Sequence, residues 1–306
     1  MRSKSARPQL GPDANLFGGH VSTTSRIGDR LASIVDRLCP IIAQVPVEHL
    51  VKTPGFMYVG PDDYWGEPSP EHRALQLELK REYDLVAELL RLLLRGAPQD
   101  LAHQLDDADS HFRLWLELRG HNWSLTPSPD RNVEAMRAAA SEFEKLLGVL
   151  QHSGSKGTLL VPDTNALLGC ADPASYRAIA GSTFTFVLLP TVLGELDSLK
   201  VEHRNPEVRE KAKAVIRRVK GWRDQGSLSA GVTVDTSIVV KSVHQEPNMD
   251  GTLSWLDSTV KDDRILASVL EVQASNPAAK VVPVTGDVNL QNKADAALVE
   301  STELSL

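Results

Sequence analysis

The hydrophobic pattern of this 306-residue chain changes near residue 152, where helical periodicity gives way to short apolar runs that alternate with helical segments. Short apolar runs are typical of strands buried on both faces, and intervening helices return the chain so that successive strands run parallel. Strands are expected at 158–162, 184–188, 236–243 and 280–285, and helices at 173–180, 191–200, 206–224, 261–275 and 287–298. The pattern predicts an α/β fold whose parallel sheet is covered on both faces.

The first half of the chain shows only helical periodicity. Helices are expected at 25–39, 69–95, 99–119 and 128–150. Ser69-Pro70 and Ser128-Pro129 each place an N-cap residue before a proline at the first helical position, and Pro40 is expected to end the first helix. We therefore expect four segments: a disordered tail at 1–20, an all-helical domain at 21–151, a linker at 152–157 and the α/β domain at 158–306.

Composition and charge limit the surfaces, the cellular compartment and the partners that we expect for this protein. The net charge is −7, so any surface that binds nucleic acid must be local. Cys39 and Cys170 lie far apart and lack the spacing of metal ligands, which favours a reduced, cytoplasmic protein. The N-terminus has no apolar segment typical of a secretory signal, and the uncharged stretch at 180–194 is too short to span a membrane. We expect no membrane partner.

Acidic residues stand at strand ends and helix starts in the second half. Asp163 and Asp287 follow predicted strands, whereas Glu195 and Asp262 lie near the starts of predicted helices. Each residue alone could simply cap a helix. However, the carboxyl ends of parallel strands meet at one edge of a sheet, and carboxylates gathered there repel one another unless a cation neutralises them. Together they indicate an all-oxygen site for Mg²⁺ or Mn²⁺ and phosphodiester chemistry.

Four sequence blocks surround these acids. They are Asp163-Thr164-Asn165-Ala166-Leu167-Leu168, Glu195-Leu196-Asp197-Ser198-Leu199-Lys200, Asp262-Asp263-Arg264-Ile265-Leu266-Ala267 and Thr285-Gly286-Asp287-Val288-Asn289-Leu290-Gln291-Asn292-Lys293-Ala294. In order and spacing the blocks resemble those of the PIN (PilT N-terminal) nuclease domain, over roughly residues 157–306. The resemblance implies a Rossmann-like α/β/α sandwich and Mg²⁺- or Mn²⁺-dependent cleavage of single-stranded RNA.

The resemblance also assigns roles to individual residues. It implies that the catalytic and metal-binding residues are Asp163, Glu195, Asp262 and Asp287. It implies supporting or auxiliary roles for Asn165, Asp197, Asp263 and Thr285. Lys261 departs from the family pattern, because an asparagine often precedes the third acid. A lysine at this position is expected to pair with Asp262 or with a phosphate.

The predicted helix at 206–224 carries basic residues on the side opposite its apolar stripe. A solvated helix face is one explanation of this pattern. The other is a track that holds the RNA backbone near the acidic site, since phosphate contacts need cations but little sequence information. The candidate RNA-binding residues of this track are Lys200, Arg204, Arg209, Lys213, Arg217 and Lys220.

Three further features belong to the helical half. One cluster of acids and histidines resembles a metal site: His103, Asp106, Asp107, Asp109 and His111. We expect a solvated helix face instead, because the three acids do not share one side of a helix with both histidines. Tyr64 and Trp65 are expected in a loop packed on the helices, with base stacking or partner contact as the alternative. The leucine-rich helix at 75–94 either fills the core or forms a surface for a dimer or partner.

The sequence therefore predicts a metal-dependent endoribonuclease with an added helical domain for substrate choice, oligomerisation or inhibition. Besides single-stranded RNA, the candidate partners are a second copy of the chain and an inhibitory protein, as in toxin–antitoxin pairs. One alternative is a non-catalytic module that binds RNA or protein. Another is a structure-specific DNA nuclease of related fold, which would require an inserted helical arch and more acids than the sequence displays.

Overall fold

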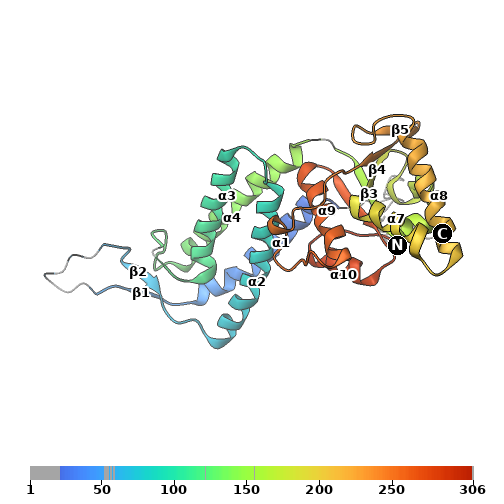
Figure 1. Ribbon diagram of the computed structural model, residues 1–306. Helices are drawn as coiled ribbons and strands as arrows, with labels where there is room; N and C mark the ends of the chain where they lie inside the picture. Colours follow the sequence, from blue (N-terminus) through green and yellow to red (C-terminus); the bar gives the residue numbers. More distant parts are fainter. Residues whose placement is uncertain are drawn as a thin grey trace, which may run out of the picture.

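The computed structural model describes residues 21–304, apart from residues 52–54, 56, 58, 121 and 155. The predicted tail at 1–20 lies outside the described residues. A helical part contains α1 to α4, and an α/β part that contains β3 to α10 follows it; the two lie against each other (Figure 1). The predicted order, a helical region followed by an α/β fold, is confirmed.

The helical part packs around a core rich in aliphatic and aromatic side chains. Its helices are α1 (Thr23–Gln44), α2 (Pro70–Leu93), α3 (Gln99–Glu117) and α4 (Pro129–His152). The rings of Tyr83, Phe112 and Phe143 are fully buried, with centroids 4.9–6.0 Å apart. Edge-to-face contacts of this kind add to the free energy gained from burial. The leucine-rich helix α2 contributes much of this core.

The first helix does not end at Pro40. It continues to Gln44, with Pro40 inside it. A proline within a helix removes one backbone hydrogen bond. Ile41 and Ile42 follow it and are 0% and 1% exposed, so burying their side chains against the core offsets that loss. Tertiary packing thus overrides the local signal that predicted the helix end.

The segment predicted as a loop contains part of a short hairpin. Strands β1 (Val47–His49) and β2 (Asp63–Trp65) pair antiparallel. Trp65 packs edge to face on Trp115, with ring centroids 6.2 Å apart, as expected for a segment held against the helices. Tyr64 is 43% exposed, so its ring stays accessible from solvent.

The acidic cluster predicted to face solvent on α3 is buried at Asp109. This side chain pairs with Arg91 and with Arg113, whose Nε lies 2.9 Å from Oδ1, and it accepts a 2.7 Å hydrogen bond from the Tyr83 hydroxyl. Burial and the Asp109 carboxylate raise the pKa of Tyr83, which keeps this donor protonated. The prediction was wrong for Asp109 because α2 covers this side of α3.

The α/β part is built on a sheet with the strand order β5-β6-β4-β3-β7. The strands are β3 (Thr158–Pro162), β4 (Phe184–Leu188), β5 (Val232–Asp235), β6 (Ile238–Ser242) and β7 (Lys280–Val284). Neighbouring strands run parallel except β5, which is antiparallel to β6. The single strand predicted at 236–243 is thus the second arm of a hairpin, and the sheet has one antiparallel edge.

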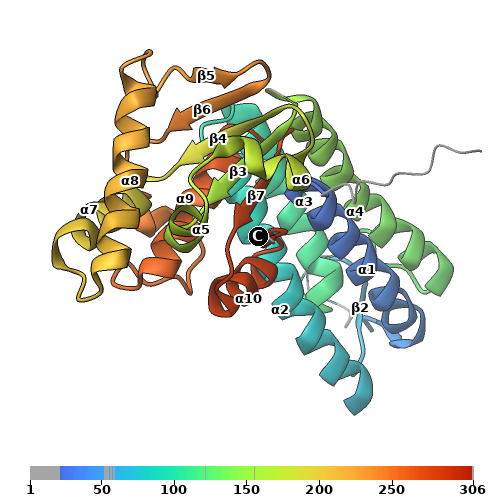
Figure 2. The same ribbon diagram turned by 90° about the vertical axis from the view of Figure 1, so that its right-hand side faces the viewer.

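Helices connect the strands and flank the sheet (Figure 2). They are α5 (Thr164–Gly169), α6 (Arg177–Ala180), α7 (Pro190–Glu202), α8 (Pro206–Arg223), α9 (Lys261–Ser275) and α10 (Val288–Ala296), with short 3₁₀ turns at Pro173–Tyr176 and Met249–Gly251. Helix α8 packs against α7 and α5, while α9 packs against β7 and α10. No helix within the described ranges is long and apolar enough to cross a membrane.

Helix α9 joins the two parts of the molecule. It contacts α2, and its buried Gln273 accepts a 3.1 Å hydrogen bond from Thr23 at the start of α1. Arg95 lies 3.8 Å from Glu271 on the same helix. The helical part therefore supports the helix whose first turn carries Asp262 and Asp263.

Candidate active site

Asp163 occupies the junction between β3 and α5. The register that pairs Pro162 with Val284 places Asp163 beside Thr285, immediately beyond the carboxyl ends of β3 and β7. Its side chain is buried and caps α5, with Oδ1 accepting a 2.6 Å hydrogen bond from the backbone N–H of Ala166. The Thr285 hydroxyl donates to Oδ2 at 2.5 Å.

Thr285 and Asn289 connect Asp163 to two further acids. The Thr285 hydroxyl accepts a 2.9 Å hydrogen bond from the backbone N–H of Asp287. Oδ1 of Asp287 caps α10 by accepting from the N–H of Asn289 at 2.8 Å. The Asn289 side chain in turn donates to Oδ2 of Asp262 at 2.9 Å. Asp163, Asp287 and Asp262 thus lie along one chain of hydrogen bonds.

Glu195 lies beside this chain of hydrogen bonds and comes from α7. Its Oε2 accepts a 2.8 Å hydrogen bond from the hydroxyl of Thr164, the residue that follows Asp163. Its Oε1 lies 3.1 Å from Nζ of Lys261 in the first turn of α9. The four predicted acids therefore gather at the carboxyl edge of the sheet, where α5, α7, α9 and α10 begin. Lys261 pairs with Glu195 and not with Asp262, the first of its two predicted partners; the second, a phosphate, stays a prediction.

The charges in this cluster act on one another. Burial raises the pKa of Asp163, and the negative charges of Asp287 and Glu195 raise it further. Hydrogen bonds from Ala166 and Thr285 oppose the shift, because they favour the ionised carboxylate. The fold thus holds a buried carboxylate at a position where negative charge is costly, and a nearby cation would relieve that cost.

The donor set suits a hard divalent cation. Within the part of the chain that the structure describes, no three His, Cys, Asp or Glu side chains form a ready-made metal cluster. Instead, the acids are held by Thr164, Thr285, Asn289 and Lys261. Carboxylate and hydroxyl oxygens are the ligands that Mg²⁺ and Mn²⁺ prefer. The chemistry of these residues therefore fits such an ion, which would replace some of the hydrogen bonds that the carboxylates now accept.

The predicted supporting residues separate into two groups. Thr285 is fully buried and bridges Asp163 to Asp287. Asp263 is also buried, but it is held by Lys293, 2.5 Å away, and by the backbone N–H of Asp257. Asp197 is exposed and pairs with Lys200, and Asn165 is exposed as well.

Sequence reasoning missed three polar residues that hold the acids. Thr164 and Asn289 hold Glu195 and Asp262, respectively, and Lys293 neutralises Asp263. All three lie inside the four sequence blocks quoted above, so their positions near the acids carried the signal. Their actual partners depend on contacts between segments distant in the chain.

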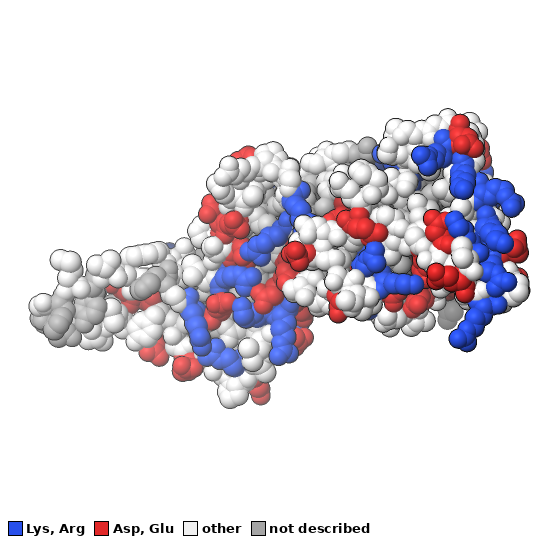
Figure 3. All heavy atoms as spheres, in the orientation of Figure 1, with Lys and Arg blue, Asp and Glu red and all other residues white. Residues whose placement is uncertain are grey.

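A basic surface runs along α8, visible as a column of blue side chains in Figure 3. Lys213 is paired with Glu210, and Arg209 donates to the backbone oxygen of His203 at 2.5 Å. By contrast, Arg217 and Lys220 are exposed and form no ion pair within the described residues, and the same holds for Arg204. The unpaired cations are the ones best able to attract a polyanion.

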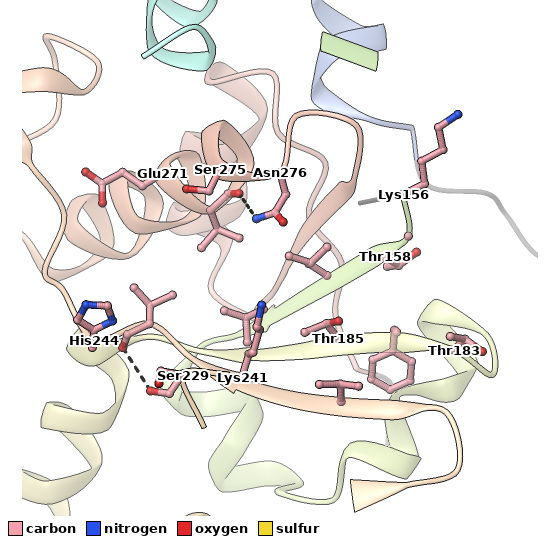
Figure 4. A pocket seen from close by; sticks show the side chains of 18 of the residues that line it. Lys156, Thr158, Thr183, Thr185, Ser229, Lys241, His244, Glu271, Ser275 and Asn276 are labelled. Carbon is pink, nitrogen blue, oxygen red and sulfur yellow. Dashed lines mark hydrogen bonds between the residues drawn. The ribbon is translucent and has the colours of Figure 1, made fainter. Parts of the chain in front are cut away.

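A cavity of about 470 Å³ lies elsewhere, between the sheet and the end of α9 (Figure 4). Its described lining includes Thr158, Thr185, Lys241 and Asn276, and none of the four acids. The sheet is therefore incompletely covered on this face. Metal binding and phosphodiester cleavage depend on carboxylates and not on the volume of a cavity. We therefore place the candidate active site at the acidic cluster.

The fold and the cluster define an α/β domain with an acidic site at the carboxyl edge of a mostly parallel sheet. Residues 160–305 match the family model of the PIN domain. The C-terminal part of this chain is thus a PIN domain, a nuclease-like fold, as its sequence blocks predicted. No curated protein matches the chain.

Proposed function

We propose that this protein is a Mg²⁺- or Mn²⁺-dependent endoribonuclease that cleaves single-stranded RNA. The carrying observation is that hydrogen bonds connect Asp163, Asp287 and Asp262 inside the matched PIN region, and that Glu195 is held by the residues next to Asp163 and Asp262. Strand ends and helix starts from four segments of the chain supply these acids to one edge of the sheet.

The residues have separate tasks in this proposal. The four acids hold the cation, while Thr164, Thr285 and Asn289 orient the carboxylates, as outer-shell partners do in metal sites. A bound divalent cation supplies charge that polarises the scissile phosphate and lowers the pKa of a water molecule. Asp262 and Asp287 each retain one carboxylate oxygen that makes no hydrogen bond to the described residues, so these oxygens are the most open to a new ligand.

The basic surface of α8 is proposed to hold the RNA backbone. Helix α8 packs against α5 and α7, the two helices that begin at Asp163 and carry Glu195. A strand of RNA lying on Arg217 and Lys220 would therefore run close to the acids. These contacts would be to phosphates and would carry little sequence preference.

Replacement of Arg217 and Lys220 by glutamate is expected to weaken RNA binding about tenfold or more at low salt and to flatten its salt dependence. Each lost phosphate contact lowers the slope of log K against log salt by about 0.7 for single strands. Fluorescence anisotropy of a labelled single-stranded RNA, measured from about 50 to about 300 mM salt, tests this prediction. The matched control is Arg81→Glu with Arg131→Glu, exposed arginines of the helical part. If both double variants show the same slope of log K against log salt, the basic residues of α8 form only a solvated helix face and do not bind RNA.

Cleavage itself is tested with the wild-type protein on labelled single-stranded RNA and DNA, in Mn²⁺, in Mg²⁺ and in EDTA. We expect cleavage of RNA in either metal and its loss in EDTA. Preferential cleavage of DNA would favour the structure-specific DNA nuclease. Binding of RNA without cleavage under every metal condition would favour the non-catalytic module, an outcome that the ion pair between Lys261 and Glu195 makes worth testing.

A further inference from the structure

Lys261 places a positive charge inside the acidic cluster. It is the first residue of α9, directly before Asp262, and Nζ lies 3.1 Å from Oε1 of Glu195. Glu195 approaches from α7, so this contact joins two helix starts across the candidate site. The ammonium thus occupies one oxygen of a carboxylate that the proposed function assigns to the metal.

Two lysines of the cluster differ in how firmly they are held. Lys293 lies 2.5 Å from the buried Asp263, and the two side chains are 23% and 6% exposed. The Lys261 side chain is 64% exposed and that of Glu195 25%. Ion pairs in water are weak and break readily, whereas a buried pair resists separation. Lys293 is therefore a fixed counter-ion, and Lys261 is a mobile one.

We propose that Lys261 is a displaceable internal counter-ion, which holds Glu195 in the metal-free protein and competes with the divalent cation for it. The inference rests on the proposed function, since it needs a metal at Glu195. Its consequence is a metal affinity that is lower than the four acids alone would provide. The flexible side chain and exposed ammonium allow Lys261 to leave Glu195 without disturbing the backbone of α9.

The test measures Mn²⁺ affinity by calorimetry without RNA. Lys261→Met is expected to bind Mn²⁺ about fivefold more tightly than wild type, the upper range for loss of an exposed ion pair. Lys261→Arg keeps the charge and should bind as wild type does. Lys241→Met removes the same charge from β6, beside the cavity that none of the four acids lines, and serves as the matched control.

The outcomes separate the two proposals. If wild type binds Mn²⁺, Asp163→Asn loses it and Lys261→Met binds with unchanged affinity, the counter-ion role is wrong while the nuclease stands. An equal gain in Lys241→Met would also overturn it, because net charge alone would then explain the effect. If wild type binds no Mn²⁺, or Asp163→Asn binds it equally well, the metal site and the counter-ion role fall together.

Discussion

Asp163→Asn is expected to abolish metal-dependent RNA cleavage and, at pH 7, to raise the melting temperature of the metal-free protein. Even outer-shell changes at metal sites cost about 10–100-fold, so loss of a central carboxylate should cost at least about 100-fold in kcat/KM. Stability should respond in the opposite direction. Burial, Asp287 and Glu195 raise the pKa of Asp163, and asparagine removes the charge while keeping an oxygen for the N–H of Ala166.

The sign of the pH dependence follows from that pKa. Because the folded-state pKa lies above the unfolded value, the folded protein binds the proton more tightly. Below its unfolded pKa, Asp163 is protonated in both states and costs no stability; the cost grows as pH rises from there through the folded pKa. The gain in melting temperature of Asp163→Asn over wild type should be largest at neutral pH and shrink in acid.

Thermal melts in EDTA from about pH 4, near the ordinary pKa of an aspartate, to about pH 8 measure this difference. Cleavage assays in Mn²⁺ measure the activity. A lower melting temperature for Asp163→Asn at pH 7 would show that the ionised carboxylate stabilises the fold, contrary to its surroundings. Full cleavage activity in this variant would remove Asp163 from the proposed metal site. The two measurements are independent, so either expectation can fail alone.

The adjacent acids Asp262 and Asp263 are expected to fail in different ways when replaced by alanine. Asp263→Ala leaves Lys293 without its buried partner and should lower the free energy of unfolding by about 3 kcal/mol. Asp262→Ala removes a partly exposed carboxylate held by Asn289, so stability should change by less than about 0.5 kcal/mol. Cleavage should fall at least about tenfold in Asp262→Ala.

Urea unfolding in EDTA gives the stabilities, and single-turnover cleavage in Mn²⁺ gives the activities. Asp130→Ala is the matched control, because Asp130 is an exposed acid in the first turn of α4. It should behave nearly as wild type in both assays, since an exposed acid in a first helical turn contributes less than about 1 kcal/mol. If Asp263→Ala lost cleavage at unchanged stability, Asp263 would belong to the metal site, contrary to the structural role assigned to it here.

Local sequence patterns predicted the elements of the fold well where burial and periodicity agree. The strand at 158–162 and the helix at 261–275 lie where the hydrophobic pattern places them. The pattern failed where distant contacts decide the outcome. Pro40 remains inside α1 because Ile41 and Ile42 are buried against the core, and the segment at 236–243 forms β6 of a hairpin whose first arm, β5, is only half buried and lacks a clear apolar run.

The resemblance of the four acidic blocks was enough to predict a PIN domain, and it singled out Asp163, Glu195, Asp262 and Asp287 as site residues. The sequence also placed Asp163 and Asp287 after predicted strands, and the carboxyl ends of parallel strands share one edge of a sheet. The partner of each side chain was decided by tertiary structure alone. Asp109 is buried by α2, Asp263 by its pairing with Lys293, and Lys261 reaches Glu195. These partners lie on different elements, and contacts of 3 Å depend on how helices pack, which no local pattern along the chain encodes.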